Sequence, residues 1–238
     1  MKSHLLQLFN EYSDGLRTLV FPRYCIICED ELNRNREHFC VQCEANLHYT
    51  YFEKYSDYTF ADQVFWGRLK IEHVFALLYY EKATSTREIL HHIKYNEGID
   101  LANYMGKMMG ERLIQSDRFS TIDVIVPIPV HSKKEFSRGY NQSQIIAEGL
   151  SETIDCHVVE ALYRKSHDES QTRKSKDERF KNVKDKFALR PNALDDYQHV
   201  LIVDDVLTTG STLEFASRAI YEGGFQGKVS LSTIAVAH

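Results

Sequence analysis

The side chains best suited to bind a ligand in this 238-residue sequence lie near its C-terminal end, where acidic and hydroxyl residues follow an apolar run. The run Val-Leu-Ile-Val at positions 200–203 is typical of a buried strand. It delivers Asp204 and Asp205 to the carboxyl end of that strand, where open α/β sheets bind ligands. A loop that opens a helix follows, consisting of Thr208, Thr209, Gly210, Ser211 and Thr212. Hydroxyls, backbone N–H groups and a helix start form a socket for a phosphate monoester, and neighbouring carboxylates accept hydrogen bonds from sugar hydroxyls. The stretch therefore predicts a sugar-phosphate site.

The spacing of this loop differs from the two common nucleotide-binding loops. No lysine follows Gly210, as G-x-x-x-x-G-K-[ST] would require, and a single glycine is too few for a dinucleotide fingerprint. The structural alternative is a plain strand-to-helix turn with a Ser/Thr cap. That alternative leaves Asp204 and Asp205 without a role at the end of a buried strand, which is energetically costly, so the sequence favours a ligand site.

Four cysteines near the N-terminal end form a second group with chemical potential. Cys25 and Cys28 make one Cys-x-x-Cys pair, and Cys40 and Cys43 make another after eleven intervening residues. Each pair fits a tight turn that points both sulfurs to one place, and four thiolates satisfy the tetrahedral preference of Zn²⁺. The spacing predicts a structural zinc centre whose binding contributes to the folding of a small module.

Two disulfides or a redox dithiol are the alternatives for these cysteines. A cytoplasmic setting disfavours disulfides, and a redox Cys-x-x-Cys normally opens a helix after a strand and is not duplicated nearby. His38 is expected to be a neighbour of the zinc centre rather than a ligand, because four cysteines suffice. Cys156 is expected to be a buried core thiol.

Apolar spacing predicts the elements that must position these residues. Strand patterns occur at 74–80, 122–128, 200–203 and 228–237, and helical spacing occurs at 84–95, 101–114, 141–150 and 211–221. Strands that alternate with helices predict an α/β fold, a parallel sheet with flanking helices on both faces. Residues 1–60 lack this pattern, so the expected domains are an N-terminal helix and four-cysteine module at 1–60 and a sheet domain at 70–238.

Composition and charge exclude several classes of protein. With 43% hydrophobic residues the chain is not disordered, and no apolar stretch reaches the roughly 18–20 residues of a membrane span. The N-terminal residues lack the features of a signal peptide, so we expect a cytoplasmic protein. Instead, an amphipathic helix docked on the protein is expected at 1–20, with a membrane-surface helix as the alternative.

The charge is unevenly distributed. Residues 164–186 carry nine Lys/Arg and five Asp/Glu, a net charge of +4, although the whole chain has −5. This local cationic segment indicates an anionic ligand handled at one place and argues against a surface that coats duplex nucleic acid. A solvated helix with alternating charges is the alternative.

Taken with the acid pair and the Thr-Thr-Gly loop, the chain resembles the type I phosphoribosyltransferases. The four-cysteine module and further motifs narrow the resemblance to the ComF family, over nearly the whole chain. These motifs are His92-Ile93-Lys94-Tyr95, Val126-Pro127-Ile128-Pro129, Ser137-Arg138-Gly139-Tyr140-Asn141-Gln142 and the stretches 171–179 and 182–187. Two departures are Tyr140, where phenylalanine is usual, and Ser137, where a charged residue is often found.

The resemblance implies that the ligand is 5-phosphoribosyl 1-diphosphate with Mg²⁺. Asp204 and Asp205 would then hold the ribose hydroxyls, and residues 208–212 the 5-phosphate. The chemistry would displace diphosphate from C1, which requires cations at the leaving group. Lys94 and Arg138 are the candidates, with Arg173 or Arg179 in addition, and the segment 171–186 is either a hood over the substrate or a solvated helix.

Three functions follow as hypotheses. The chain is an enzyme that transfers phosphoribose to an unidentified acceptor, or a regulator that binds a phosphoribosyl or nucleotide ligand without turnover. The third hypothesis, implied by the family resemblance, is a DNA-uptake and transformation factor that binds competence proteins or single-stranded DNA.

Overall fold

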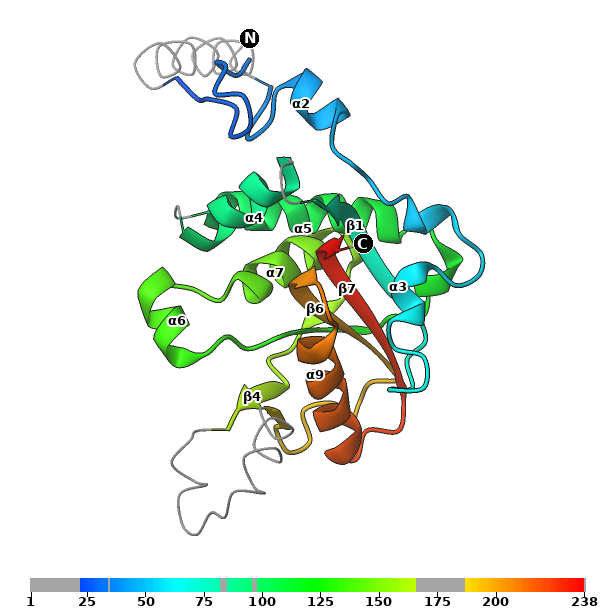
Figure 1. Cartoon of the computed structure of the whole chain (residues 1–238). Coiled ribbons are helices and arrows are strands. Elements are labelled where there is room, and N and C mark those ends of the chain that lie inside the picture. Colours follow the sequence, from blue (N-terminus) through cyan, green and yellow to red (C-terminus); the bar gives the residue numbers. More distant parts are fainter. Residues whose placement is uncertain (1–21, 34, 82–84, 96–97, 166–186, 238) are drawn as a thin grey trace, which may run out of the picture.

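The computed structural model describes residues 22–33, 35–81, 85–95, 98–165 and 187–237, and its centre is one parallel sheet (Figure 1). Five strands follow one another in the order β1-β7-β6-β2-β3, and every neighbouring pair is parallel. Their bounds are β1 Val74–Tyr80, β2 Val124–Pro127, β3 His157–Val158, β6 His199–Leu207 and β7 Lys228–Ala237. The predicted α/β fold with a parallel sheet is confirmed.

Helices cover both faces of this sheet, which is why its central strands are apolar almost without interruption. The chain passes from β1 through α4 (Ser85–Tyr95) and α5 (Ile99–Leu113) to β2, and from β2 through α7 (Gln142–Ile154) to β3. From β6 it returns through α9 (Ser211–Glu222) to β7, in the opposite direction along the sheet. Because such crossovers are right-handed, α5 and α7 cover one face and α9 covers the other (Figure 1).

Two helices on the first face approach each other closely at glycines. A Cβ atom on Gly106 of α5 would lie 2.2 Å from the carbonyl oxygen of Ile146, and one on Gly149 of α7 would lie 2.1 Å from that of Asn103. Any side chain at either position would separate the helices. This contact fixes α7 over β2 and β6, the strands that carry the candidate site.

The N-terminal part of the described chain packs against β1. It contains the short helices α2 (Val41–Ala45), η1 (Phe52–Lys54) and α3 (Phe60–Gln63). Backbone hydrogen bonds join Thr50 N–H to the Leu77 carbonyl and Tyr79 N–H to the His48 carbonyl. Phe39 and Phe52 belong to the same core as the sheet. The division into 1–60 and 70–238 stays a prediction.

Most periodic segments form the elements that their spacing predicts. Strands β1 and β7 have the predicted bounds, and α4, α5, α7 and α9 each end within a few residues of prediction. Strand β6 is longer than predicted, because Asp204, Val206 and Leu207 still pair with β7, so that both acids lie within the strand instead of following it. The expected N-terminal helix and the segment 171–186 lie outside the described residues.

Short elements were not predicted. These are α6 (Ser132–Arg138), the turn η2 (Asp117–Phe119), and an antiparallel pair of β4 (Leu162–Arg164) and β5 (Phe187–Leu189). None of them is long enough to show a period. In the described part of the chain, no helix has the length and apolar character needed to cross a membrane.

Candidate active site and metal centre

The candidate site lies where the sheet changes direction. Helix α9 leaves β6 toward one face and α7 follows β2 on the other, so the carboxyl ends of β6 and β2 diverge between their connections. Open α/β sheets bind ligands in the crevice at such a switch point. The last residues of β6 and the loop to α9 carry the predicted acids and hydroxyls.

Asp204 is buried at this point and has defined partners. Its side chain is 8% exposed, and Oδ1 accepts a hydrogen bond from Ser143 Oγ at 3.0 Å and another from the backbone N–H of Asp205 at 2.9 Å. Burial, followed by the charge of Asp205, raises the pKa of Asp204 to about 7. This carboxyl group is therefore poised between its neutral and charged forms at physiological pH.

Asp205 is paired with a cation from another element. Lys94, in the last turn of α4, places its Nζ 2.7 Å from Asp205 Oδ2, with the lysine side chain 23% exposed and the carboxylate side chain 7% exposed. The hydroxyl of Tyr140 donates to the backbone carbonyl of Ile93 and so ties the end of α4 to the loop before α7. The structure thus brings Lys94 to one of the two acids, and its role in the site stays a prediction.

The loop after β6 presents its hydroxyls to solvent. Thr208, Thr209, Ser211 and Thr212 are exposed, and the hydroxyls of Thr209 and Ser211 lie 3.1 Å apart. Gly210 has a φ of +76°, and no side chain caps the start of α9. The open hydroxyls and the N-terminus of a twelve-residue helix together suit an anion.

A segment far away in the sequence supports this loop from behind. Arg68 Nη1 donates to the carbonyl of Thr209 at 3.1 Å and to that of Val64 at 3.0 Å, and Arg68 also forms an ion pair with Glu214 of α9. The ring of Phe65 lies against Gly210, 2.9 Å from where a Cβ atom would be. Sequence reasoning missed Arg68, because no local pattern marks a contact across 141 positions.

Two further arginines have defined partners, and one of them, Arg164, interacts with Asp204. Arg138, at the end of α6, donates to Gln142 Oε1 at 2.7 Å, and its guanidinium stands 5.5 Å from the ring centre of Tyr95, beside Lys94. Arg164 of β4 was not singled out as a site residue by the sequence. Its Nε donates to the carbonyl of Pro129 at 2.8 Å; burial lowers its pKa, and Asp204 opposes that effect. Arg173 and Arg179 lie outside the described residues.

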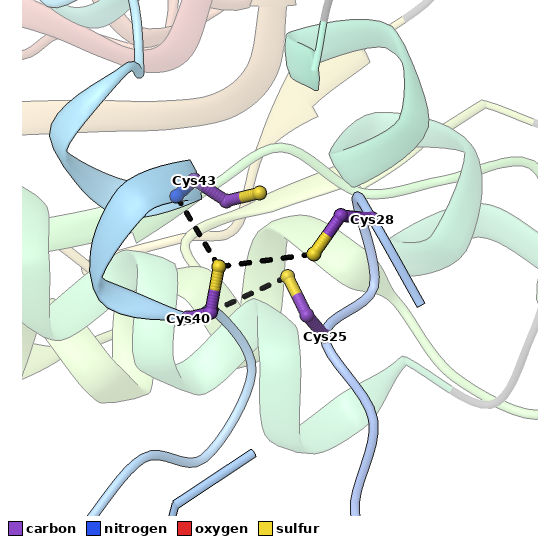
Figure 2. Close-up of side chains that lie close together, drawn as sticks. All are labelled: Cys25, Cys28, Cys40 and Cys43. Atoms are coloured by element: carbon purple, nitrogen blue, oxygen red, sulfur yellow. Dashed lines mark hydrogen bonds between the residues drawn. The ribbon is translucent and has the colours of Figure 1, made fainter. Parts of the chain in front are cut away.

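The four predicted cysteines form one cluster (Figure 2). Their sulfur atoms all lie within 4.8 Å of one another, and the Sγ atoms of Cys28 and Cys40 are 3.7 Å apart. Cys40 also caps α2, since its sulfur accepts from the N–H of Cys43 at 3.4 Å. The cluster could hold a metal ion.

His38 and Cys156 lie outside this cluster, as the sequence led us to expect. The His38 ring packs on Tyr104 of α5, with ring centres 5.1 Å apart, and His38 is not a member of the cluster. Cys156 packs against the core but is half-buried rather than fully buried, and its Sγ donates to the carbonyl of Ile122 at 3.3 Å.

The family described as the phosphoribosyl transferase domain matches residues 110–237, more than half of the chain. The chain belongs to this family. Within this phosphoribosyl transferase domain lie both acids, the loop 208–212, Arg138 and Arg164. Lys94, Arg68 and the four cysteines come from the part of the chain that precedes the matched residues.

Curated relatives are competence and DNA-utilization proteins. Competence protein F of Haemophilus influenzae is 32% identical over 106 residues, 44% of this chain and 46% of that protein. Competence protein ComFC of Bacillus subtilis is 32% identical over 111 residues, which make up 47% of this chain and 43% of that protein. DNA utilization protein YhgH of Escherichia coli is 27% identical over 140 residues, which make up 57% of this chain and 61% of that protein. The chain thus spans about half the length of the curated relatives it matches, and these relatives confirm the resemblance to the ComF family.

One solved structure that aligns with part of the chain is glutamine phosphoribosylpyrophosphate amidotransferase from B. subtilis, complexed with ADP and GMP. It aligns with a TM-score of 0.40 and 17% sequence identity, over 60% of this chain and 30% of that chain.

Proposed function

We propose that this protein binds 5-phosphoribosyl 1-diphosphate at the switch point of its sheet and transfers the phosphoribosyl group to an acceptor. One observation carries the proposal. In a chain of the phosphoribosyl transferase domain family, β6 delivers two buried acids directly in front of an open hydroxyl loop at a helix N-terminus. Burying two adjacent acids is costly, and the raised pKa of Asp204 shows that its own hydrogen bonds do not fully offset that cost, which favours a ligand at the pair.

The two parts of this site suit the two parts of a ribose phosphate. The exposed hydroxyls and free helix start at 208–212 fit the 5-phosphate, which is an anion. Asp204 and Asp205 fit the ribose hydroxyls, which donate to carboxylate oxygens. The loop follows the acids within three residues, so one bound sugar phosphate can reach both.

The donor set at the acids also fits Mg²⁺. Two adjacent carboxylates offer the oxygen ligands that this ion prefers, and Mg²⁺ usually binds through one or two carboxylates together with phosphate oxygens of the substrate. Asp204 and Asp205 would hold it, and it would offset the negative charge of the diphosphate. Lys94 now compensates Asp205, so part of the charge balance is already in place.

The chain's own cations serve the leaving group. Displacement at C1 needs no protein nucleophile, only stabilisation of the negative charge that develops on the departing diphosphate. Lys94 pairs with Asp205, and Arg138 contacts the ring of Tyr95, the residue that follows Lys94. We assign this role to them.

The four cysteines are proposed to hold structural Zn²⁺. A tetrahedral site with Zn–S bonds of about 2.3 Å places its sulfurs about 3.8 Å apart, close to the Cys28–Cys40 separation of 3.7 Å. Four thiolates leave no open position, so this centre supports the fold and takes no part in transfer. Zinc-bound thiols suit a reducing compartment, and we place the protein in the cytoplasm on that ground.

Calorimetry tests the main proposal. Titration with 5-phosphoribosyl 1-diphosphate and Mg²⁺ should give saturable heat, and the double variant Asp204→Asn plus Asp205→Asn should abolish it. The matched control is Asp195→Asn plus Asp196→Asn, an exposed acid pair that removes the same charge before β6. Equal binding by both double variants would refute the site. Diphosphate release with candidate acceptors then separates an enzyme from a regulator.

The second candidate function is DNA uptake. The observation that favours it is that two relatives are named competence proteins and a third a DNA utilization protein. In this role the protein would bind single-stranded DNA or competence proteins without turnover. A deletion strain complemented with the Asp204→Asn plus Asp205→Asn variant tests it: full transformation by the variant would separate uptake from the phosphoribosyl site, and normal transformation of the deletion strain would exclude the role.

A further inference from the structure

A buried ion pair lies at the start of the segment that supports the loop 208–212. Nη2 of Arg118, in η2, donates to both carboxylate oxygens of Asp62, in α3, at 3.1 Å and 2.9 Å. The two side chains are 4% and 2% exposed. The carboxylate also accepts from the hydroxyl and the backbone N–H of Thr59, and from the N–H of Val74 at 2.7 Å. One side chain thus joins η2, the start of α3 and the first residue of β1.

This pair fixes positions more than it adds stability. Transferring both charges out of water is costly, and the attraction between them repays that cost only in part. Removing one partner would leave the other charge buried and uncompensated, so the two side chains stay together. Arg118 and Asp62 are 56 positions apart, and neither belongs to the site described above. The geometry of the pair therefore sets where α3 lies relative to η2 and β1.

From Asp62 a short path of contacts leads to the loop. The Asp62 carbonyl accepts from the N–H of Phe65 at 3.1 Å, and the Phe65 carbonyl accepts from that of Arg68 at 3.0 Å. Phe65 is fully buried, with its ring against Gly210, and Arg68 donates to the carbonyl of Thr209 at 3.1 Å. Because these turns are hydrogen-bonded, a displacement of Asp62 should displace both contacts with the loop.

His73 brings a titratable group to the ion pair. Its Nδ1 lies 3.2 Å from both Nε and Nη2 of Arg118, and it accepts from Nε. The ring packs against those of Tyr58 and Phe119, with centres 6.1 Å and 5.9 Å away. A guanidinium can only donate, so this contact requires an unprotonated Nδ1. Protonation of His73 would replace an acceptor by a second positive charge beside Arg118.

The surroundings of His73 favour the neutral ring. Burial, followed by the charge of Arg118, lowers the pKa of His73 below its usual value. The charged and titratable groups that interact with it come from several elements, and they are Arg118, Asp62, Glu72, Lys228 and His199. The two carboxylates oppose the lowering of the pKa but do not outweigh it. His73 is therefore neutral at pH 7 and becomes charged only in acidic solution.

We propose that Arg118 and Asp62 are positioning residues for the loop at the start of α9, and that protonation of His73 loosens their hold on it. The inference rests on the proposed function and adds a regulation of its phosphate site. At neutral pH the ion pair holds α3, and α3 holds the segment 64–68 behind the loop. In acidic solution the charged His73 repels Arg118, so the loop should lose its support and bind phosphate less tightly.

The test uses the full-length protein and calorimetry with ribose 5-phosphate, which has no leaving group. Binding of 5-phosphoribosyl 1-diphosphate with Mg²⁺ by the wild type is measured first, and its absence would overturn the proposed function itself. Arg118→Gln should weaken ribose 5-phosphate about 3–10-fold at pH 7.5 and leave inorganic diphosphate unchanged. Arg112→Gln is the matched control, because it breaks another ion pair with a buried acid, Glu53, between α5 and η1. This control should bind ribose 5-phosphate like the wild type.

A second substitution separates positioning from general destabilisation. Arg68→Ala removes the support directly, so Arg118→Gln combined with it should weaken ribose 5-phosphate no further than the stronger single change does. Losses that multiply would mean that the two arginines act independently, and would overturn the positioning role. Equal weakening of ribose 5-phosphate and diphosphate by Arg118→Gln would overturn it as well.

The pH dependence tests His73 with a milder change. His73→Asn keeps an acceptor oxygen for Arg118 but cannot be protonated in this range. The variant should bind ribose 5-phosphate like the wild type at pH 7.5 and about 3-fold more tightly at pH 5, because only the wild type then gains the extra charge. Titration of Asp204 and of the ligand phosphate affects both proteins alike. A constant ratio of the two affinities from pH 7.5 to 5 would overturn the control by His73, and this measurement decides even if Arg118→Gln does not fold.

Discussion

The two adjacent acids of β6 stand in different surroundings. Asp204 is enclosed, with a hydroxyl and a backbone N–H as its donors, and its pKa is raised. Asp205 has the ammonium of Lys94 at 2.7 Å. The fold thus destabilises the charged form of Asp204, whereas the ammonium of Lys94 balances the negative charge of Asp205. This asymmetry gives the pair a measurable pH signature.

Replacing Asp204 by asparagine should stabilise the protein at neutral and alkaline pH. The pKa of Asp204, about 7 when folded, lies above the value of about 4 in an unfolded chain. Between these values the folded state retains a proton that the unfolded state has lost, so wild-type stability falls as pH rises through that window. Asp204→Asn, which keeps an acceptor for Ser143, should raise the free energy of unfolding at pH 8 by roughly 2–4 kcal/mol, as measured by urea denaturation.

At pH 2.5, well below both pKa values, this gain should vanish, because Asp204 is then protonated in both states. Asp195→Asn is the control: that acid is exposed, and its replacement should change stability little at either pH. A variant that is less stable than wild type at pH 8 would contradict the raised pKa. Ligand affinity should fall in the same variant, so stability and binding should move in opposite directions.

Whether a site residue could be predicted from the sequence depends on whether its neighbours in the site are also its neighbours along the chain. Asp204, Asp205 and the loop 208–212 are contiguous, and their order alone predicts their chemistry. Lys94 was found through the family resemblance. Ser143, Arg68 and Arg164 were missed because only the packing of distant elements brings them to the site.

At the scale of elements, the segment 64–68 supports the loop 208–212. Phe65 presses on the loop at Gly210, and Arg68 joins Thr209 to Glu214 of α9. Burial opposes ionisation of Glu214, but Arg68 and Arg218 together hold its pKa below its usual range. The loop is thus held from behind while its hydroxyls stay open in front.

Gly210→Ala should distort the loop for two separate reasons. Its φ of +76° is unfavourable for alanine, and the new Cβ atom would lie 2.9 Å from the Phe65 ring. We expect a loss of about 1–3 kcal/mol in unfolding free energy and at least 10-fold weaker binding of ribose 5-phosphate. Gly224→Ala is the matched control, because Gly224 also has a positive φ, +102°, but nothing lies within 4 Å of the added Cβ atom. It should lose stability only, and equal binding by both variants would contradict the role of the loop.

Arg68→Ala tests the support itself. Without the guanidinium, the Thr209 carbonyl and Glu214 lose their shared partner, so affinity for ribose 5-phosphate should fall about 3–10-fold while affinity for inorganic diphosphate stays unchanged. Arg218→Ala is the control, since Arg218 also binds Glu214 but contacts Arg68 rather than the loop. If both variants weaken both ligands alike, Arg68 acts on general stability and does not position the loop.

The elements that the sequence predicted well are the long periodic ones. β1, β7 and α9 have enough residues to show the apolar pattern of a strand or a helix, and the pattern stops clearly at their ends. The β4–β5 pair has three residues in each strand, so its pairing is specified by contacts with the rest of the fold and not by pattern. Residues of this pair line a cavity of about 1060 Å³ at the carboxyl end of β2, so the walls of that cavity could not be predicted from the sequence.

At the scale of the whole molecule, the cysteine cluster and the sheet share one hydrophobic core. Phe39 precedes Cys40 directly and is fully buried, and its ring centre lies 5.9 Å from that of Tyr104 on α5. His38 packs on the same tyrosine. Leu47, just after α2, belongs to the core that contains β1. Loss of the fold around the cysteines would therefore remove side chains from the core of the transferase domain.

Metal removal should consequently destabilise the entire protein and not only its N-terminal part. Zinc would supply much of the folding free energy of the cysteine segment. Without zinc, Phe39 and Leu47 should become exposed, which should lower the free energy of unfolding of the whole protein by about 2–3 kcal/mol. Calorimetric scans of chelated protein should show one transition lowered by roughly 5–10 °C, with one zinc released per chain in a dye assay. Cys40→Ser should behave like chelated protein, whereas Cys156→Ser should keep its zinc, because Cys156 lies outside the cluster. An unchanged main transition after chelation would mean that the shared core does not couple the two parts, despite the contacts of Phe39 with Tyr104.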